Sequence, residues 1–371
     1  MEKQICTYCV MDNEGDSSIV FDEEGQCNYC KDALRRLPKE YFPNQEGKRR
    51  LNALMEEIKT NTKNDPYNCM VGVSGGLDSS YLLYLGYQYN LKMLAVHIDD
   101  GLDSEIATDN IKKLCEKTGS RLITICPKED EYADLILAFL KAGVSNLAMP
   151  QDNILFRALD DVAKENNIKY SLSGVNFAME SILARFEEGN ACDKKHILKI
   201  HEQFGEKEII ELQFQSLWRR YVGNKYFSKV DIVKPLNYID YNFKTVLEKL
   251  HEFCDYVYYD GKHYESILTR FLQCYYLPVK YGIDKRKSHF SSLIVSGQMT
   301  RKEAIEQLKS NPYIDTGLYE QDKRRLAEFL HITEDEFIFL CNQPPKKHAE
   351  YKMSFLNRLA PIARKFRKFL Q

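Results

Sequence analysis

A glycine-rich segment at residues 74–79, with the sequence Ser-Gly-Gly-Leu-Asp-Ser, has the residue types that hold a chain of phosphates. Gly75 and Gly76 let the backbone approach an anion closely, and the hydroxyls of Ser74 and Ser79 add hydrogen-bond donors. Asp78 supplies a carboxylate of the kind that binds Mg²⁺. The segment lacks the Gly-Lys-Ser ending of a Walker motif and the GxGxxG of a dinucleotide fold. We expect it to grip the pyrophosphate part of a nucleotide, the alternative being a Gly-Gly turn before a serine-capped helix.

Four cysteines near the start of the chain form two Cys-x2-Cys pairs separated by 17 residues: Cys6, Cys9, Cys27 and Cys30. This spacing brings four thiolates to the corners of one tetrahedron, which is the geometry of structural Zn²⁺ sites. A redox pair is the alternative, but redox CxxC motifs rarely come doubled. Four protein ligands leave no open position for catalysis, so the predicted zinc ion holds a small domain together.

The elements that must position the glycine-rich segment follow from an alternation of strand-like and helix-like patterns that begins near residue 68. Helices are expected at residues 79–89 and 106–117, the second ended by Gly119. Short apolar runs predict strands on either side of them, at residues 69–73, 92–98, 121–126, 169–173 and 231–233. The alternation predicts the α/β class, with a parallel sheet covered on both faces.

The position of the Ser-Gly-Gly-x-Asp-Ser motif, directly after the first strand, resembles the signature of the N-type ATP pyrophosphatases, or PP-loop proteins. Five further stretches resemble the N-acetyl sugar amidotransferases, and the likeness spans nearly the whole chain: residues 21–25, 149–152, 173–180, 261–266 and 281–286. The resemblance implies an ATP- and Mg²⁺-dependent enzyme that forms AMP and pyrophosphate. It would convert the acetamido group of a sugar into an acetamidino group during the synthesis of a surface glycan or a flagellin sugar.

With this resemblance, we expect the chain to have four parts. They are a zinc-binding knuckle domain at 1–36, a helical linker at 37–66, a PP-loop ATP-pyrophosphatase domain at 67–240 and a helical C-terminal region at 241–371.

Polar residues that follow the second and fourth predicted strands are candidates for nucleotide binding, because α/β folds bind ligands at the carboxyl ends of parallel strands. Asp99 and Asp100 follow the second strand, where they either meet the ribose or Mg²⁺ or form only a polar turn. Gly174 and Asn176 follow the fourth strand in the same way. Glu180, one turn further, either binds metal or relays a proton, the alternative being a glutamate on a helix surface.

Two residues in the stretch 261–266 are candidates for the chemistry itself. Lys262 is expected to neutralise the α-phosphate or the departing pyrophosphate, although a lysine outside this stretch would be read as a solvated surface residue. Arg270 and Arg286 are weaker candidates for that task. His263 is a candidate base for the attacking ammonium, the alternative being an interior histidine with ordinary hydrogen bonds.

Composition narrows the class of function. A formal net charge of −2 supplies no global field to hold RNA, so we expect no nucleic-acid partner. The alternative is a tRNA-thiolating PP-loop ATP pyrophosphatase, which needs a persulfide cysteine, an iron–sulfur cluster or an RNA-binding appendage. No close pair is formed by Cys115, Cys126, Cys192, Cys254, Cys274 and Cys341. A non-catalytic zinc-ribbon adaptor is a further alternative, against which the intact segment 74–79 argues.

The source of nitrogen must lie outside this chain if the reaction is an amidotransfer. The chain begins Met-Glu rather than with a nucleophilic cysteine, and no cysteine stands in a Gly-x-Cys-x-Gly elbow. The resemblance implies a separate glutaminase working with a barrel-type subunit, beside the N-acetyl sugar substrate.

The eleven cysteines, together with the lack of an apolar leader or a run of about 18 apolar residues, predict a cytoplasmic chain without a transmembrane segment. The basic residues 346–371 carry apolar side chains at helical spacing. They either pack on the body or dock on a membrane or partner.

Overall fold

The structure is a computed structural model that describes residues 3–16, 18–184, 189–228, 230–259, 261–262, 264–313 and 315–357. Five parallel strands form one sheet in the order β3-β2-β1-β4-β5. They are β1 (Cys69–Gly72), β2 (Met93–Ile98), β3 (Arg121–Ile125), β4 (Tyr170–Leu172) and β5 (Asp231–Val233). The predicted α/β class and all five predicted strands are therefore confirmed, with ends that differ by no more than one or two residues.

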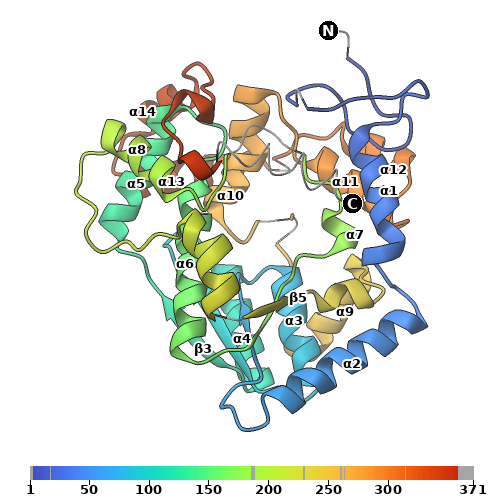
Figure 1. Ribbon diagram of the computed structural model, residues 1–371. Coiled ribbons are helices and arrows are strands. Elements are labelled where there is room, and N and C mark those ends of the chain that lie inside the picture. Colours follow the sequence, from blue (N-terminus) through green and yellow to red (C-terminus); the bar gives the residue numbers. More distant parts are fainter. Residues whose placement is uncertain are drawn as a thin grey trace.

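Helices surround the sheet and make up most of the chain after β5 (Figure 1). In chain order the α-helices of the described residues are α1 (Asn28–Glu40), α2 (Gln45–Asn61), α3 (Leu77–Gln88), α4 (Glu105–Thr118), α5 (Glu129–Ala142), α6 (Met149–Glu165), α7 (Phe177–Glu180), α8 (Lys194–Phe204), α9 (Phe243–Cys254), α10 (Ile267–Phe271), α11 (Arg286–Val295), α12 (Arg301–Gln307), α13 (Thr316–Phe329) and α14 (Glu334–Cys341). Segments of π-helix lie at Arg219–Ser228 and Leu272–Tyr281, and short 3-10 helices lie at Pro235–Tyr238 and His348–Glu350. The expected helical C-terminal region is confirmed.

The central strands are apolar on both faces because helices cover both sides of the sheet. Successive side chains of a strand point to opposite faces. Met70 and Leu94 accordingly pack in a small core beneath α6, whereas Val71 and Ala95 belong to the main core beneath α3. The burial of both faces explains why the strands are near-continuous apolar runs.

Helix α4 begins and ends where its capping residues predict. The hydroxyl of Ser104 accepts a hydrogen bond from the amide of Ala107 at 3.2 Å, and this satisfies a free N–H of the first turn. Gly119 ends the helix in the left-handed conformation, with φ of 65°. Such local signals explain why the helix could be predicted from the sequence.

The direction in which the chain adds strands to the sheet reverses at β1. The chain moves from β1 outward to β2 and β3, and then returns to β4 on the other side of β1. In open parallel sheets this reversal leaves a crevice at the carboxyl ends of the two strands that flank it. The glycine-rich loop follows β1 and residues 173–176 follow β4, so both predicted segments lie at the crevice.

The N-terminal segment folds against the C-terminal helices rather than standing apart (Figure 1). Helix α1 runs past residue 36 and packs on α11, and the four paired cysteines belong to the main core. The predicted basic segment lies outside the described residues from residue 358 onward. Among the described helices, none combines the length and the apolar character that crossing a membrane requires.

Candidate functional site

The glycine-rich loop is held in an unusual backbone conformation by tight packing. Gly75 has φ of +75°, a region that favours glycine. A Cβ at this position would lie 2.4 Å from the carbonyl oxygen of Ala107 at the start of α4. The hydroxyl of Tyr256 donates to the carbonyl of Gly75 at 2.8 Å, from a ring that is almost fully buried. Glycine is therefore required both by the dihedral angle and by the space.

The two serines of the loop bond to its backbone. The hydroxyl of Ser79 accepts from the amide of Ser74 at 3.3 Å and donates to the carbonyl of Gly76 at 3.1 Å. The hydroxyl of Ser74 accepts from the amide of Gly76 at 3.3 Å. These bonds close the loop at the N-terminus of α3, where backbone amides and the positive end of the helix dipole attract an anion.

Asp78 is the residue through which the loop meets the end of β4. Its Oδ1 accepts a hydrogen bond from Nδ2 of Asn176 at 3.3 Å and another from the buried hydroxyl of Tyr241. A Cβ on Gly174 would lie 3.1 Å from Cβ of Asp78, so this close approach leaves no room for a larger residue without a shift. The structure thus brings together three predicted site residues at the switch point of the sheet.

Lys262 and Glu180 form a partly buried ion pair. Nζ of Lys262 lies 3.1 Å from Oε1 of Glu180, and the two side chains are 22% and 18% exposed. Lys262 is therefore not a solvated surface lysine. The neighbouring candidate, His263, lies outside the described residues.

The two arginines that were weaker candidates are engaged elsewhere. Arg270 makes a buried bidentate pair with Asp322, with Nε 2.7 Å from Oδ2. Arg286 pairs with Asp284, with its NH2 2.7 Å from Oδ2. Both guanidinium groups hold the C-terminal helices together.

Asp99 and Asp100 differ in surroundings although they are adjacent. Asp99 is half-buried and accepts from the amide of Gly101 at 3.1 Å. Asp100 is buried, and its Oδ2 accepts from Tyr132 at 2.9 Å and from Gln151 at 2.6 Å. Burial raises the pKa of the Asp100 carboxyl to about 6. Their partners Gly101, Tyr132 and Gln151 lie outside the glycine-rich loop. Asp99 and Asp100 are therefore not brought to the loop as directly as Asn176 and Gly174.

A carboxylate that sequence reasoning did not single out stands at the wall of the loop. Oε1 of Glu265 lies 3.5 Å from the hydroxyl of Ser74, and it would be 2.8 Å from a Cβ on Gly76. The other oxygen, Oε2, accepts a hydrogen bond from Tyr259 at 3.0 Å. The sequence signal that could have identified Glu265 is its place in the stretch 261–266.

A histidine beneath the loop was also missed. Nδ1 of His97 lies 3.0 Å from the carbonyl of Val73, so this nitrogen carries the donated proton, and Nε2 lies 3.4 Å from Oδ2 of Asp103. Burial disfavours the charged imidazolium, but the nearby carboxylate of Asp103 outweighs this effect and raises the pKa of His97. A histidine inside an apolar strand, followed by acidic residues, was the signal in the sequence.

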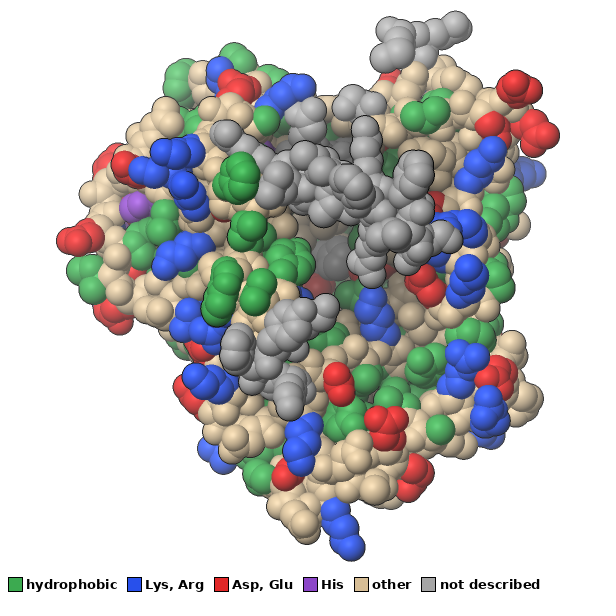
Figure 2. Space-filling view, viewed as in Figure 1, with side chains coloured by type: hydrophobic (Ala, Val, Ile, Leu, Met, Phe, Trp, Pro, Cys, Tyr) green, Lys and Arg blue, Asp and Glu red, His purple; other side chains and the backbone are tan. Residues whose placement is uncertain are grey.

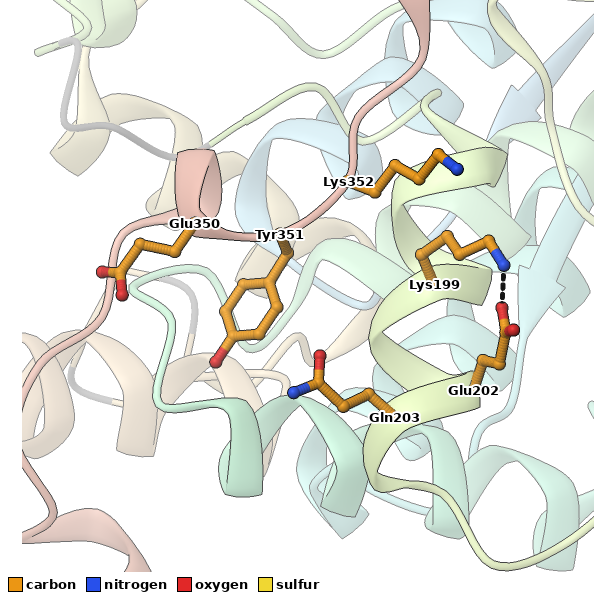
Figure 3. A pocket seen from close by; sticks show the side chains of 6 residues that line it. All are labelled: Lys199, Glu202, Gln203, Glu350, Tyr351 and Lys352. Carbon is orange, nitrogen blue, oxygen red and sulfur yellow. Dashed lines mark hydrogen bonds and ion pairs between the residues drawn. The ribbon is translucent and has the colours of Figure 1, made fainter.

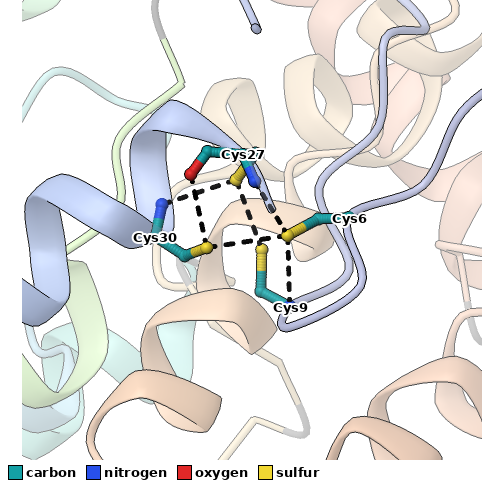
Figure 4. Close-up of side chains that lie close together, drawn as sticks. All are labelled: Cys6, Cys9, Cys27 and Cys30. Carbon is teal, nitrogen blue, oxygen red and sulfur yellow. Dashed lines mark hydrogen bonds between the residues drawn. The ribbon is translucent and has the colours of Figure 1, made fainter. Parts of the chain in front are cut away.

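The four paired cysteines converge on one point (Figure 4). Their sulfur atoms all lie within 4.8 Å of one another, and no part of the four residues is exposed. Two sulfur pairs, Cys6 with Cys30 and Cys9 with Cys27, are 3.6 Å apart. Zinc–sulfur bonds in a tetrahedron place sulfur atoms about 3.8 Å apart. The donor set and the spacing therefore fit a four-coordinate metal ion.

The face seen in Figure 2 is hollowed near its centre, at the place that lies between α6, α7 and α10 in Figure 1. Side chains of both charge signs surround this hollow. A separate depression lies on α8, where Lys199 and Glu202 form an ion pair (Figure 3). It is lined by Lys199, Glu202, Gln203, Glu350, Tyr351 and Lys352, none of which belongs to the glycine-rich loop or to the strand ends.

The sheet and the loop together define a doubly wound α/β protein with a glycine-rich loop at its switch point. Residues 265–362 match the family described as LPS biosynthesis protein WbpG-like, C-terminal domain. The match begins at Glu265, the residue at the wall of the loop. Comparison with curated proteins found no match.

Three solved structures illustrate how distant the structural likenesses are. The U34-tRNA thiolase NcsA from Methanococcus maripaludis, solved with its [4Fe-4S] cluster, is 14% identical, with a TM-score of 0.33 over 92% of this chain and 90% of that one. NMN synthetase from Francisella tularensis is 14% identical, with a TM-score of 0.32 over 81% and 93%. The NH3-dependent NAD synthetase from Campylobacter jejuni is 14% identical, with a TM-score of 0.33 over 81% and 98%. Likenesses at this level identify no activity.

Proposed function

We propose that the chain is an ATP-dependent, AMP-forming amidotransferase that converts the acetamido group of an N-acetyl sugar into an acetamidino group in surface-glycan synthesis. The observation that carries the proposal is the contact between Asp78, in the glycine-rich loop, and Asn176, after β4. This contact joins the two strand ends that flank the crevice. The match of residues 265–362 to a WbpG-like LPS biosynthesis domain supports a sugar as the second substrate.

The chemistry explains why ATP is needed. An amide oxygen is a poor leaving group, so ammonia does not displace it at neutral pH. The amide oxygen would attack the α-phosphorus of ATP, and the bond to pyrophosphate would break. Ammonia then attacks the carbon of the O-adenyl imidate, AMP departs with the former amide oxygen, and loss of a proton leaves the amidine.

The protein supplies positioning and charge neutralisation in this scheme. The loop amides and the hydroxyls of Ser74 and Ser79 would bind the phosphates. Mg²⁺, bound through Asp78, would offset their negative charge. Lys262 would face the developing pyrophosphate after exchanging its partner Glu180 for a phosphate oxygen.

Zn²⁺ is the ion that we assign to the four cysteines, as a structural centre. All four positions of a tetrahedral ion would be filled by sulfur, so no substrate could bind there. No described cysteine stands in a glutaminase motif, and we therefore propose a separate glutaminase with a barrel-type subunit as the source of ammonia.

The decisive experiment measures pyrophosphate release from ATP with candidate N-acetyl sugars and ammonium chloride. We expect sustained, multiple-turnover release only when ATP, sugar and ammonium are all present, and a product about one mass unit lighter than the sugar because nitrogen attack replaces O by NH. Asp78→Ala should abolish release while circular dichroism stays unchanged, and Asp109→Asn, a change on the exposed face of α4, should leave it intact. Release that depends on tRNA and a sulfur donor instead of a sugar would contradict the proposal.

A further inference from the structure

Helix α11 carries two stripes of hydrogen-bonding side chains that face different parts of the protein. Lys287 and Ser288 lie four and three residues before Ser291, and all three contact the cysteine segment. His289, Ser292 and Ser296 lie on another side and face α7 and the residues after it. A helix of ten residues thus touches both the predicted metal centre and the predicted site.

The first stripe holds the backbone that carries the cysteines. The hydroxyl of Ser291 accepts from the amide of Val10 at 3.2 Å, one residue after Cys9. Nζ of Lys287 lies 2.5 Å from Oδ2 of the buried Asp12. Just beyond α11, the guanidinium of Arg301 donates to the carbonyl of Cys6 and to that of Cys9, both at 3.0 Å.

The second stripe holds α7. The hydroxyl of Ser292, fully buried, accepts from the amide of Ile182 at 2.9 Å. The hydroxyl of Ser296 donates to the carbonyl of Ala178 at 3.0 Å, and Nδ1 of His289 lies 3.3 Å from the carbonyl of Met179. These bonds span the residues on both sides of Glu180.

Helix α1 makes a second connection from the metal centre to α7. Its N-cap is Cys27 and its first turn contains Cys30. NH2 of Arg36 donates to the carbonyl of Ser181 at 2.5 Å, and the guanidinium lies 5.4 Å from the ring centre of Phe177. Both helices that hold the cysteine segment therefore also hold α7.

We propose that the metal-loaded four-cysteine centre is a positioning device for α7, acting through α1 and α11. Its targets are the two functional side chains at the ends of α7. Asn176 caps the helix and bonds to Asp78, and Glu180 pairs with Lys262. That these side chains serve a reaction rests on the proposed function, whereas their positioning by the metal centre does not.

The first test follows hydrogen exchange in the full chain with and without metal. The amides to follow are those of Met179, Glu180 and Ser181, which bond within residues 176–181. Removing the metal with a chelator should speed their exchange about ten-fold or more, and added Zn²⁺ should restore it. Amides of α4 and β3 should keep their rates. Unchanged exchange in α7, or an equal rise in α4, would overturn the proposal.

A second test leaves the metal in place and removes contacts that α11 and α1 make with α7 and the residues directly after it. The double variant Ser292→Ala with Arg36→Gln should keep one equivalent of zinc and yet show fast exchange at Met179, Glu180 and Ser181. The matched control, Ser120→Ala with Arg35→Gln, changes the same residue types at positions whose side chains contact neither α7 nor the cysteine segment. Slow exchange in the test variant, or equal effects of both variants, would contradict the proposal.

Pyrophosphate release measured on the same samples separates the two ideas. Coupled exchange without any release would leave the positioning intact and contradict the proposed function. Release that persists while α7 exchange does not respond to metal would contradict the positioning instead.

Discussion

The hydroxyl of Tyr241 donates a hydrogen bond to Oδ1 of Asp78, across 163 residues of sequence. The tyrosine is fully buried and lies after β5, and the aspartate stands in the first turn of α3. Burial and the carboxylate of Asp78 together raise the pKa of Tyr241 well above its usual value, so the phenol stays protonated and acts as a donor. Oδ1 of Asp78 thus accepts from Tyr241 as well as from Asn176, so residues after β5 and after β4 both hold this carboxylate.

Tyr241→Phe tests whether this hydrogen bond orients Asp78. A hydrogen bond to a charged group contributes about 1.5–3 kcal/mol, so we expect a lower Tm and, at limiting Mg²⁺, at least about a ten-fold lower kcat/KM for pyrophosphate release. Tyr81→Phe is the matched control, because the ring of Tyr81 packs edge-on against Tyr241 at 5.8 Å. Equal kinetics in the two variants would show that the bond serves stability alone.

The pair of Lys262 and Glu180 calls for a double-mutant cycle. If Lys262 neutralises pyrophosphate, Lys262→Met should lower kcat/KM by about 10- to 100-fold, while Glu180→Gln should have a smaller effect because the cation remains. Stability should show coupling between the two positions, since they are in contact. Kinetic losses that merely follow the losses in Tm would indicate a structural ion pair.

Cys27→Ser should remove the metal from the four-cysteine centre. We expect zinc content to fall from one equivalent per chain to nearly none and Tm to fall, because metal binding contributes to the folding of such sites. Cys115→Ser is the control, as Cys115 is buried but lies outside the cluster. A full zinc equivalent and native stability in Cys27→Ser would refute the assignment.

Two buried histidines predict acid sensitivity. Nε2 of His196 lies 2.8 Å from Nδ1 of His348, and the amide of Asn146 donates to Nε2 of His348. Burial, and then repulsion from His196, lower the pKa of His348 to about 3, and burial lowers the pKa of His196. The unfolded chain takes up protons below about pH 6.5 that the folded chain does not.

The two histidines should therefore contribute a loss of stability as the pH drops below about 6.5, by up to about 1.4 kcal/mol per pH unit each, whereas the raised pKa of Asp100 contributes a gain below about pH 6. His348→Asn should be less stable at pH 7 but should flatten this slope in urea unfolding. His331→Asn, at a histidine that is 57% exposed, should keep the wild-type slope. An unchanged slope in His348→Asn would mean that another group causes the acid sensitivity.

The pH dependence of catalysis tests the nitrogen source. Because NH3 rather than NH4⁺ attacks, activity on ammonium salts should rise with pH until groups of the protein titrate. With glutamine, activity should need an added glutaminase and should rise less with pH, since channelled ammonia need not equilibrate with solvent. Mass spectrometry of the sugar supplies the measurement. Turnover of glutamine by this chain alone would contradict the proposal.

Local patterns in the sequence were sufficient to predict the secondary-structure elements and two sets of candidate site residues. Strands with apolar side chains, Gly119 as a helix end and the Cys-x2-Cys spacing each depend on residues that are near one another in the chain. The loop at residues 74–79 is of this kind in part, because its serine hydrogen bonds are internal to it.

The tertiary structure alone decided which distant residues complete the site. Tyr241, Tyr256 and Glu265 reach the loop from more than 160 residues away, and for the two tyrosines nothing in the neighbouring sequence marks them as its partners. The two stripes of α11 likewise depend on contacts with segments that are distant in the sequence. A side chain's role here depends on which groups the order of the strands and the packing of the helices bring within hydrogen-bonding distance. Periodicity specifies that a helix has an apolar face, whereas its contacts depend on the rest of the fold.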